Sequence, residues 1–163
     1  MGKVKPKYII GHWTAGNYIP NSIDMNSYDL LVTGDGILIK GLKEFDSEKC
    51  TTAGMNSITY NIACCGGLQQ TPLKKVQCEK FFKTVADRLK LFGLTPNDFY
   101  THHEIGEMTR NYLNKKNADK ITDILPYNKY LINNIGKIDL TKMPYENMTP
   151  TDIRNKIRWY FNK

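Results

Sequence analysis

The stretch that decides the fold is YIIGHWTAG, residues 8–16, in which a short apolar run ends at a histidine. The run Tyr8–Trp13 has the length and the aliphatic and aromatic content typical of a buried β-strand. The chain holds three histidines, and the other two, His102 and His103, follow another strand-like stretch in YTHHEIG. Side chains at the same end of neighbouring strands project from one edge of a sheet. His12 and one of the later histidines can therefore converge on a metal ion.

Further strands and a tight turn are expected between these histidines. Asp35 and Gly36 lie between two apolar runs, which is the strongest short signal of a β-hairpin. Besides the first strand, the apolar runs predict strands at Tyr28–Thr33, Ile58–Cys65 and Phe99–Thr101. Because helical patterns interleave with these strands, the sequence predicts an α/β class domain that occupies residues 1–163.

Two helices have readable ends. Apolar residues recur at spacings of three and four before Gly93, which predicts an amphipathic helix that stops at this glycine. We expect this helix to begin at Thr71, followed by a proline in its first turn. Near the C-terminus, Thr149 and Asp152 have the spacing of a helix cap. The helix that ends at Gly93 is expected to cover the sheet.

Size and charge limit the classes of partner. The chain has 163 residues and a net charge of +7, with a pI near 9.2, which favours an anionic partner. No recognised nucleic-acid motif is present, so we expect no nucleic-acid partner. The apolar run after the basic N-terminus is too short for a secretory leader, and no apolar stretch is long enough for a membrane helix. We expect synthesis in the cytoplasm without cleavage, and reduced thiols, because the four cysteines lack C-x-x-C spacing.

A catalytic zinc site needs one more protein ligand than the histidines supply. Such a site has three protein ligands and an open position for water, so His12 and one later histidine leave one ligand to find. Candidates lie in NADKITDILPY, residues 117–127. The alternative for a single histidine is a hydrogen-bonded core or surface residue.

Several blocks together resemble a known family. HWTAG, YDLLVTGDGILIKG, TAGMNSITYNIACCGG, THHEIG and DILP resemble, in order, the blocks of the zinc-dependent N-acetylmuramoyl-L-alanine amidases of type 2. This family includes bacteriophage endolysins and is related to the peptidoglycan-recognition proteins, and the resemblance extends over residues 8–127. It implies a central mixed sheet flanked by helices. It also implies a Zn²⁺ cofactor and hydrolysis of the peptidoglycan amide that joins N-acetylmuramic acid to L-alanine.

The resemblance implies a ligand set. The first family ligand falls on His12, and the second falls on His102, because a histidine, any residue, an acidic residue and an aliphatic one match residues 102–105. Strand alternation allows only one of the two adjacent histidines to face the site, and His103 is the alternative. The third family ligand falls on Asp123, with Asp119 as the fallback. If either aspartate is not a metal ligand, it is a helix cap or a solvated carboxylate in a loop.

The resemblance also implies two catalytic side chains. In the family, a tyrosine positions the water, and this tyrosine falls on Tyr28. The alternative role for Tyr28 is that of a half-buried aromatic residue in a strand. A family lysine that stabilises the oxyanion has Lys120 as its nearest match. That lysine usually lies two positions before the third ligand, whereas Lys120 lies three before Asp123. In addition, Thr51 stands where many relatives have a histidine.

Three other functions stay open at this point. The first is a binding module of the same fold that recognises peptidoglycan without cutting it. The second is a cysteine hydrolase that uses Cys64 or Cys65 with His102 or His103, and the third is a basic nucleic-acid binder. For the favoured amidase we expect a monomeric phage or prophage endolysin that reaches the wall after the inner membrane is breached.

Overall fold

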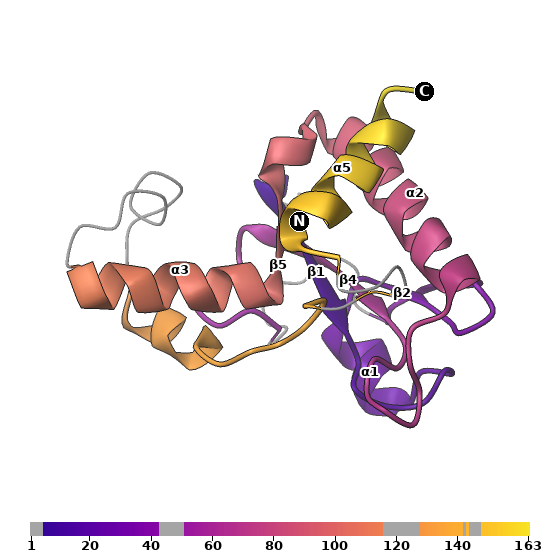
Figure 1. The fold of residues 1–163 in the computed structure, drawn as a ribbon, viewed down its shortest axis with the longest axis horizontal. Coiled ribbons are helices and arrows are strands. Elements are labelled where there is room, and N and C mark those ends of the chain that lie inside the picture. The colour runs from indigo at the N-terminus through magenta and orange to yellow at the C-terminus, as the bar shows by residue number, and fades with distance from the viewer. Residues whose placement is uncertain (1–4, 43–50, 116–127, 142, 144–147) are drawn as a thin grey trace.

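A five-stranded mixed sheet forms the centre of the molecule in the computed structural model (Figure 1), which describes residues 5–42, 51–115, 128–141, 143 and 148–163. The strand order is β3-β2-β4-β1-β5, and only β3 runs antiparallel to its neighbour. The strands are β1 (Tyr8–Trp13), β2 (Leu30–Val32), β3 (Leu38–Lys40), β4 (Thr59–Cys64) and β5 (Phe99–Thr101). The expected α/β class and mixed sheet are confirmed.

The expected hairpin connects β2 and β3. Gly36 adopts a φ of +79°, a left-handed conformation that glycine reaches without a steric penalty, and its N–H donates to the Thr33 carbonyl at 2.9 Å. The Thr33 N–H donates to the Ile37 carbonyl and closes the turn. Thus the Asp-Gly signal identified both the turn and the antiparallel edge of the sheet.

Helices cover the two faces of the sheet unequally (Figure 1). The helical elements are α1 (Ser22–Ser27), α2 (Lys75–Phe92), η1 (Pro96–Asp98), α3 (His102–Lys115), η2 (Lys129–Asn134) and α5 (Pro150–Phe161). Helices α2 and α5 pack together on one face, while α3 and η2 pack together at the other. Within the described ranges, no helix combines the length and apolar character needed to cross a bilayer.

Alternation along β1 divides the core into two clusters. Ile9 packs into the large apolar cluster with Phe82 of α2 and Ile153 of α5. Ile10 points the other way, into a smaller cluster with Ile105 of α3. By the period of two, His12 shares the face of Ile10, so β1 directs its histidine toward the side of the sheet that carries α3.

The ends of the long helices test the cap predictions. Gly93 ends α2 in the left-handed conformation, and Thr149 caps α5, both as predicted. The predicted Thr71 cap is wrong, because α2 starts after Lys74, whose N–H donates to the Gln77 side chain at 3.1 Å. The Thr71 hydroxyl instead donates to the Gly16 carbonyl at 2.7 Å and holds the loop after β1.

The junction of β5 and α3 corrects another expectation. The adjacent histidines were assigned to a strand, but His102 and His103 form the first turn of α3. The cause is a reciprocal cap: the Thr101 hydroxyl accepts from the Glu104 N–H at 3.1 Å, and the Glu104 carboxylate accepts from the Thr101 N–H at 2.9 Å. Strand alternation therefore does not separate the two histidines, and their positions on the helix do.

Candidate metal centre

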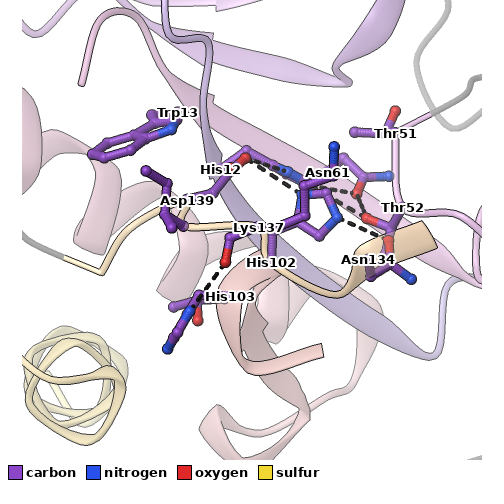
Figure 2. Close-up of polar contacts among 12 residues, drawn as sticks. His12, Trp13, Thr51, Thr52, Asn61, His102, His103, Asn134, Lys137 and Asp139 are labelled. Atoms are coloured by element: carbon purple, nitrogen blue, oxygen red, sulfur yellow. Dashed lines mark hydrogen bonds and ion pairs between the residues drawn. The ribbon is translucent and has the colours of Figure 1, made fainter. Parts of the chain in front are cut away.

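Three side chains from distant parts of the chain converge beyond the carboxyl end of β1 (Figure 2). His12 comes from β1, His102 begins α3, and Asp139 follows η2. Their ligand atoms all lie within 4.8 Å of one another. The Asp139 Oδ2 atom lies 3.4 Å from Nδ1 of His12 and 3.4 Å from Nδ1 of His102. The structure thus brings together the two histidines that the sequence singled out.

The opposite ring nitrogen of each imidazole contacts a buried asparagine (Figure 2). His12 Nε2 lies 2.8 Å from Oδ1 of Asn61, and His102 Nε2 lies 2.9 Å from Oδ1 of Asn134. An amide oxygen only accepts hydrogen bonds, so each Nε2 carries a proton, while each Nδ1 faces the Asp139 carboxylate. Two ring nitrogens and a carboxylate oxygen that face one another form a donor set suited to a cation.

Spacing and charge fit the zinc that the family implies. Ligands about 2.1 Å from a tetrahedral zinc ion lie about 3.4 Å apart, which matches both nitrogen to oxygen distances. Burial lowers the pKa of His12 and keeps its imidazole neutral. Burial alone raises the pKa of the Asp139 carboxyl, but contacts with His102 and His12 bring it below its ordinary value. Neutral imidazoles and a charged carboxylate are the protonation states that metal binding requires.

Asp139 is a candidate ligand that was not predicted from the sequence. The predicted third ligand Asp123, its fallback Asp119 and the predicted catalytic Lys120 lie outside the described residues. One signal was available, because Lys137 stands two positions before Asp139, the spacing that the family lysine usually has.

A backbone anchor holds Asp139 in place. The next residue, Leu140, adopts a left-handed φ of +59° and is fully buried in the large apolar cluster. This conformation costs a leucine about 1 kcal/mol or more and persists because the surrounding packing requires it. A Cβ atom added to Gly11 would lie 2.7 Å from Cδ1 of Leu140, so Leu140 packs against the residue before His12. The turn therefore fixes the carboxylate relative to β1.

Tyr28, a predicted catalytic residue, lies beside the histidine pair. Its ring centroid is 5.2 Å from that of His12, and its hydroxyl donates to the Trp13 carbonyl at 3.3 Å. Burial, followed by the negative charge of Asp139, raises the pKa of Tyr28. At neutral pH this phenol is protonated and is a hydrogen-bond donor.

Two neighbouring hollows meet at the centre. One, of about 280 Å³, is lined by residues that include Tyr28 and Asp139, and the other, of about 400 Å³, extends toward Asn56 and Tyr130. Both are also lined by Thr51, His102 and Lys137. A substrate that lies across the centre can therefore occupy both hollows, with the Lys137 side chain beside it.

The remaining candidates have other contacts. His103 Nδ1 lies 3.1 Å from the Lys137 carbonyl, and the described His-His-Asp group includes His102 in its place. Glu104 forms an ion pair with Arg154 of α5 at 2.8 Å. Cys64 and Cys65 are free and buried, and burial raises the pKa of Cys65 to about 12. A protonated, buried thiol is a poor nucleophile, so the cysteine hydrolase is disfavoured.

Fold and site together define an α/β domain with a His-His-Asp cluster at the carboxyl edge of a mixed sheet. The sequence profile of the N-acetylmuramoyl-L-alanine amidase family matches residues 2–119, well over half of the chain. The chain therefore belongs to the N-acetylmuramoyl-L-alanine amidase family. No curated protein matches it by sequence.

Solved structures share this fold at low sequence identity. An endolysin of the Thermus scotoductus MAT2119 bacteriophage Ph2119 is 20% identical with a TM-score of 0.51, over 62% of this chain and 73% of that one. The endolysin amidase LysCS of Clostridium intestinale is 17% identical with a TM-score of 0.51, over 63% of this chain and 72% of that one. The amidase LysC of the same organism is 14% identical with a TM-score of 0.56, over 95% of this chain and 87% of that one. At these identities the likeness concerns the fold.

Proposed function

We propose that the protein is a zinc-dependent amidase that hydrolyses the bond between N-acetylmuramic acid and L-alanine in peptidoglycan. The observation that carries this proposal is the convergence of His12, His102 and Asp139 within 4.8 Å, at the edge of a fold whose family acts on this bond. The net charge of +7 supports attraction to an anionic cell wall, which salt should weaken.

The three converging side chains would hold the ion. When bound, zinc lowers the pKa of a coordinated water to about 7 and polarises the scissile carbonyl. His12 and His102 are neutral ligands that leave the ion with positive charge, and Asp139 supplies the single compensating carboxylate.

Tyr28 and Lys137 are the catalytic side chains in this proposal. The Tyr28 hydroxyl is protonated beside His12, and by turning its single proton away from the Trp13 carbonyl it can orient the water or donate to the charge that develops on the scissile carbonyl oxygen. The Lys137 ammonium lines both hollows and can stabilise the same oxyanion. Lys120 remains an untested candidate for that role, and the spacing from Asp139 favours Lys137.

The biological setting is a further part of the proposal. We propose a phage or prophage lysin that is made in the host cytoplasm and acts on the wall after membrane breach. Lysis by this charged protein should weaken as ionic strength rises, because attraction to the wall is screened.

Digestion of purified cell wall tests the proposed reaction. Stem peptides with a free L-alanine amino group should appear by mass spectrometry, while glycan strands stay intact. Activity should disappear with a strong chelator and return with added zinc. New reducing sugar ends without freed alanine amines would show a glycosidase and overturn the proposal.

The non-catalytic binding module remains the second candidate. It is favoured if the purified protein retains one zinc per chain and sediments with cell wall, yet releases no alanine amines. The presence of Tyr28 and Lys137 beside the candidate centre favours the enzyme.

A further inference from the structure

Two buried carboxamides contact the two candidate histidine ligands in the same way. We propose that Asn61 and Asn134 are positioning residues that keep the proton on Nε2 of His12 and His102 and so hold each Nδ1 free for the metal. The inference rests on the proposed zinc function and extends it to residues outside the metal-binding set. Asn61 lies in β4 and Asn134 at the end of η2, so the same device arises from two unrelated elements.

The orientation of the Asn134 amide follows from its other contacts. Its Nδ2 lies 2.8 Å from the Ala53 carbonyl oxygen and 3.2 Å from the Leu131 carbonyl oxygen. Both partners only accept, so the amide nitrogen must occupy this position, and Oδ1 must face His102. Since Oδ1 is 2.9 Å from His102 Nε2, that ring nitrogen must be the donor.

A hydroxyl relay fixes the Asn61 amide in a corresponding way. The Thr59 hydroxyl donates to the Met55 carbonyl at 2.9 Å, so its oxygen is an acceptor for Asn61 Nδ2 at 3.3 Å. On the other side of the amide, the Thr52 hydroxyl donates to Asn61 Oδ1 at 3.2 Å. Oδ1 must therefore face His12, whose Nε2 is 2.8 Å away and donates to it.

Burial makes the loss of either asparagine contact costly. Asn61 and Asn134 are 2% and 1% exposed, so bulk water cannot replace a lost acceptor. If either ring moved its proton to Nδ1, the proton would face Asp139 Oδ2 at 3.4 Å, and the bare Nε2 would lose its closer contact with an asparagine oxygen. Nδ1 would then no longer offer a lone pair to the ion. Loss of such outer partners of metal-binding histidines typically lowers metal affinity about 10- to 100-fold.

His103 is an internal reference with the opposite arrangement. Its Nδ1 lies 3.1 Å from the Lys137 carbonyl oxygen, an acceptor, so Nδ1 carries the proton in this contact. The structure thus assigns Nε2–H to His12 and His102 and Nδ1–H to the neighbouring His103.

Nitrogen-15 NMR of the metal-free, unsubstituted chain tests the assignment without any variant. Spectra that correlate ring protons with ring nitrogens at a pH where the imidazoles are neutral should report Nε2–H for His12 and His102. An Nδ1–H tautomer at either residue would overturn the inference. Cell-wall hydrolysis by the same preparation is a separate measurement, so failure of the proposed function is distinguished from failure of the tautomer assignment.

Substitution then tests the consequence for metal binding. Asn61→Leu and Asn134→Leu should each weaken Zn²⁺ binding about 10- to 100-fold in competition with a chelating indicator, because leucine offers no acceptor. Asn61→Asp restores an acceptor and should recover most of the affinity, because the Thr59 hydroxyl that accepts from the Asn61 amide can turn and donate to a carboxylate. Asn155→Leu, which removes an exposed asparagine of α5, is the matched control and should bind zinc like the parent.

The possible results distinguish a role in positioning the histidine rings from general damage to the fold. Folded leucine variants with parental zinc affinity would overturn the inference while the proposed amidase function stands. If a leucine variant does not fold, Asn61→Asp decides, since a folded aspartate variant that has lost zinc affinity contradicts the role of the acceptor. Retained affinity in that variant, with Nε2–H at His12, supports the role.

Discussion

The candidate centre has two halves that are built differently. The sheet half consists of His12 of β1, Tyr28 of the segment before β2, and Asn61 of β4. The C-terminal half consists of side chains from α3, η2 and the turn that follows, namely His102, Asn134, Lys137 and Asp139. Each half offers one imidazole, one asparagine acceptor and one candidate catalytic side chain.

The difference lies in how each half is supported. His12 and Asn61 belong to paired strands, in which ladder hydrogen bonds set the backbone. Asp139 depends on the left-handed Leu140 and its burial, and Asn134 depends on close contact between η2 and α3. The sheet half is therefore fixed by regular structure, and the C-terminal half is fixed by individual side chains that a single substitution can displace.

Removal of the C-terminal carboxylate should have the largest effect. Asp139→Ala should lose zinc after dialysis, because two imidazoles alone compete poorly with water for the ion. Asp123→Ala is the matched control and should keep about one zinc per chain by metal analysis. The reverse result would assign the third ligand to Asp123 and would break the comparison between the halves.

Substitution of the candidate catalytic side chain in each half shows how much that half contributes to turnover. Tyr28→Phe and Lys137→Met should each retain zinc and reduce kcat about 100-fold, since each removes one donor to developing charge. Turnover is measured as alanine amines released from purified cell wall. If only one variant is slowed, the donor lies in that half alone, and the other residue has a structural role.

Substitution of a glycine that packs against each half tests how rigid that half is. A Cβ at Gly106 of α3 would lie 2.2 Å from the Asn134 carbonyl oxygen, and one at Gly11 of β1 would lie 2.7 Å from a Leu140 methyl group. Gly106→Ala should cost about 2–3 kcal/mol of unfolding free energy and Gly11→Ala somewhat less, because a backbone carbonyl cannot rotate away.

Urea denaturation measures both costs. Gly16→Ala is the control, because its Cβ would meet only the Thr14 hydroxyl at 3.7 Å, and its stability should change by about 0.5 kcal/mol or less. An unchanged urea midpoint for Gly106→Ala would show that η2 yields readily, and that the contact between η2 and α3 does not fix Asn134.

Acid should have the smallest effect, and it acts on the sheet half first. Burial lowers the pKa of His12, so below pH 6.5 the unfolded chain takes up a proton that the folded chain resists. Without metal, the unfolding free energy should therefore fall by about 1 kcal/mol between pH 6.5 and 5.5. The lowered pKa of Asp139 adds a second loss, which begins near pH 4 as the unfolded carboxylate is protonated.

Denaturation at several pH values measures this slope. His12→Gln should flatten the dependence between pH 6.5 and 5.5, because it removes the group whose protonation differs between the two states. A slope in this variant that equals the parental slope would assign the effect to other groups.

The sequence predicted the sheet half better than the C-terminal half. Periodicity and the Asp-Gly pair identified β1, β4 and the hairpin because these depend on local pattern, and His12 follows directly from β1. Asp139 was missed because its position depends on a turn that Leu140 packing holds. The capping spacing of Thr101 and Glu104 was readable and would have placed His102 in a helix.

The wide separation of His12 and Asp139 along the chain has a consequence for the polymer as a whole. An ion bound to both would close a loop that contains most of the chain, as a cross-link does. The described cysteines are free thiols, so among the described residues no disulfide does the same. A covalent cross-link over about 100 residues removes roughly 4–5 kcal/mol of unfolded-state entropy. Unlike a disulfide, the ion would leave when the chain unfolds, so zinc would stabilise the fold by its binding free energy and not by this loss of entropy.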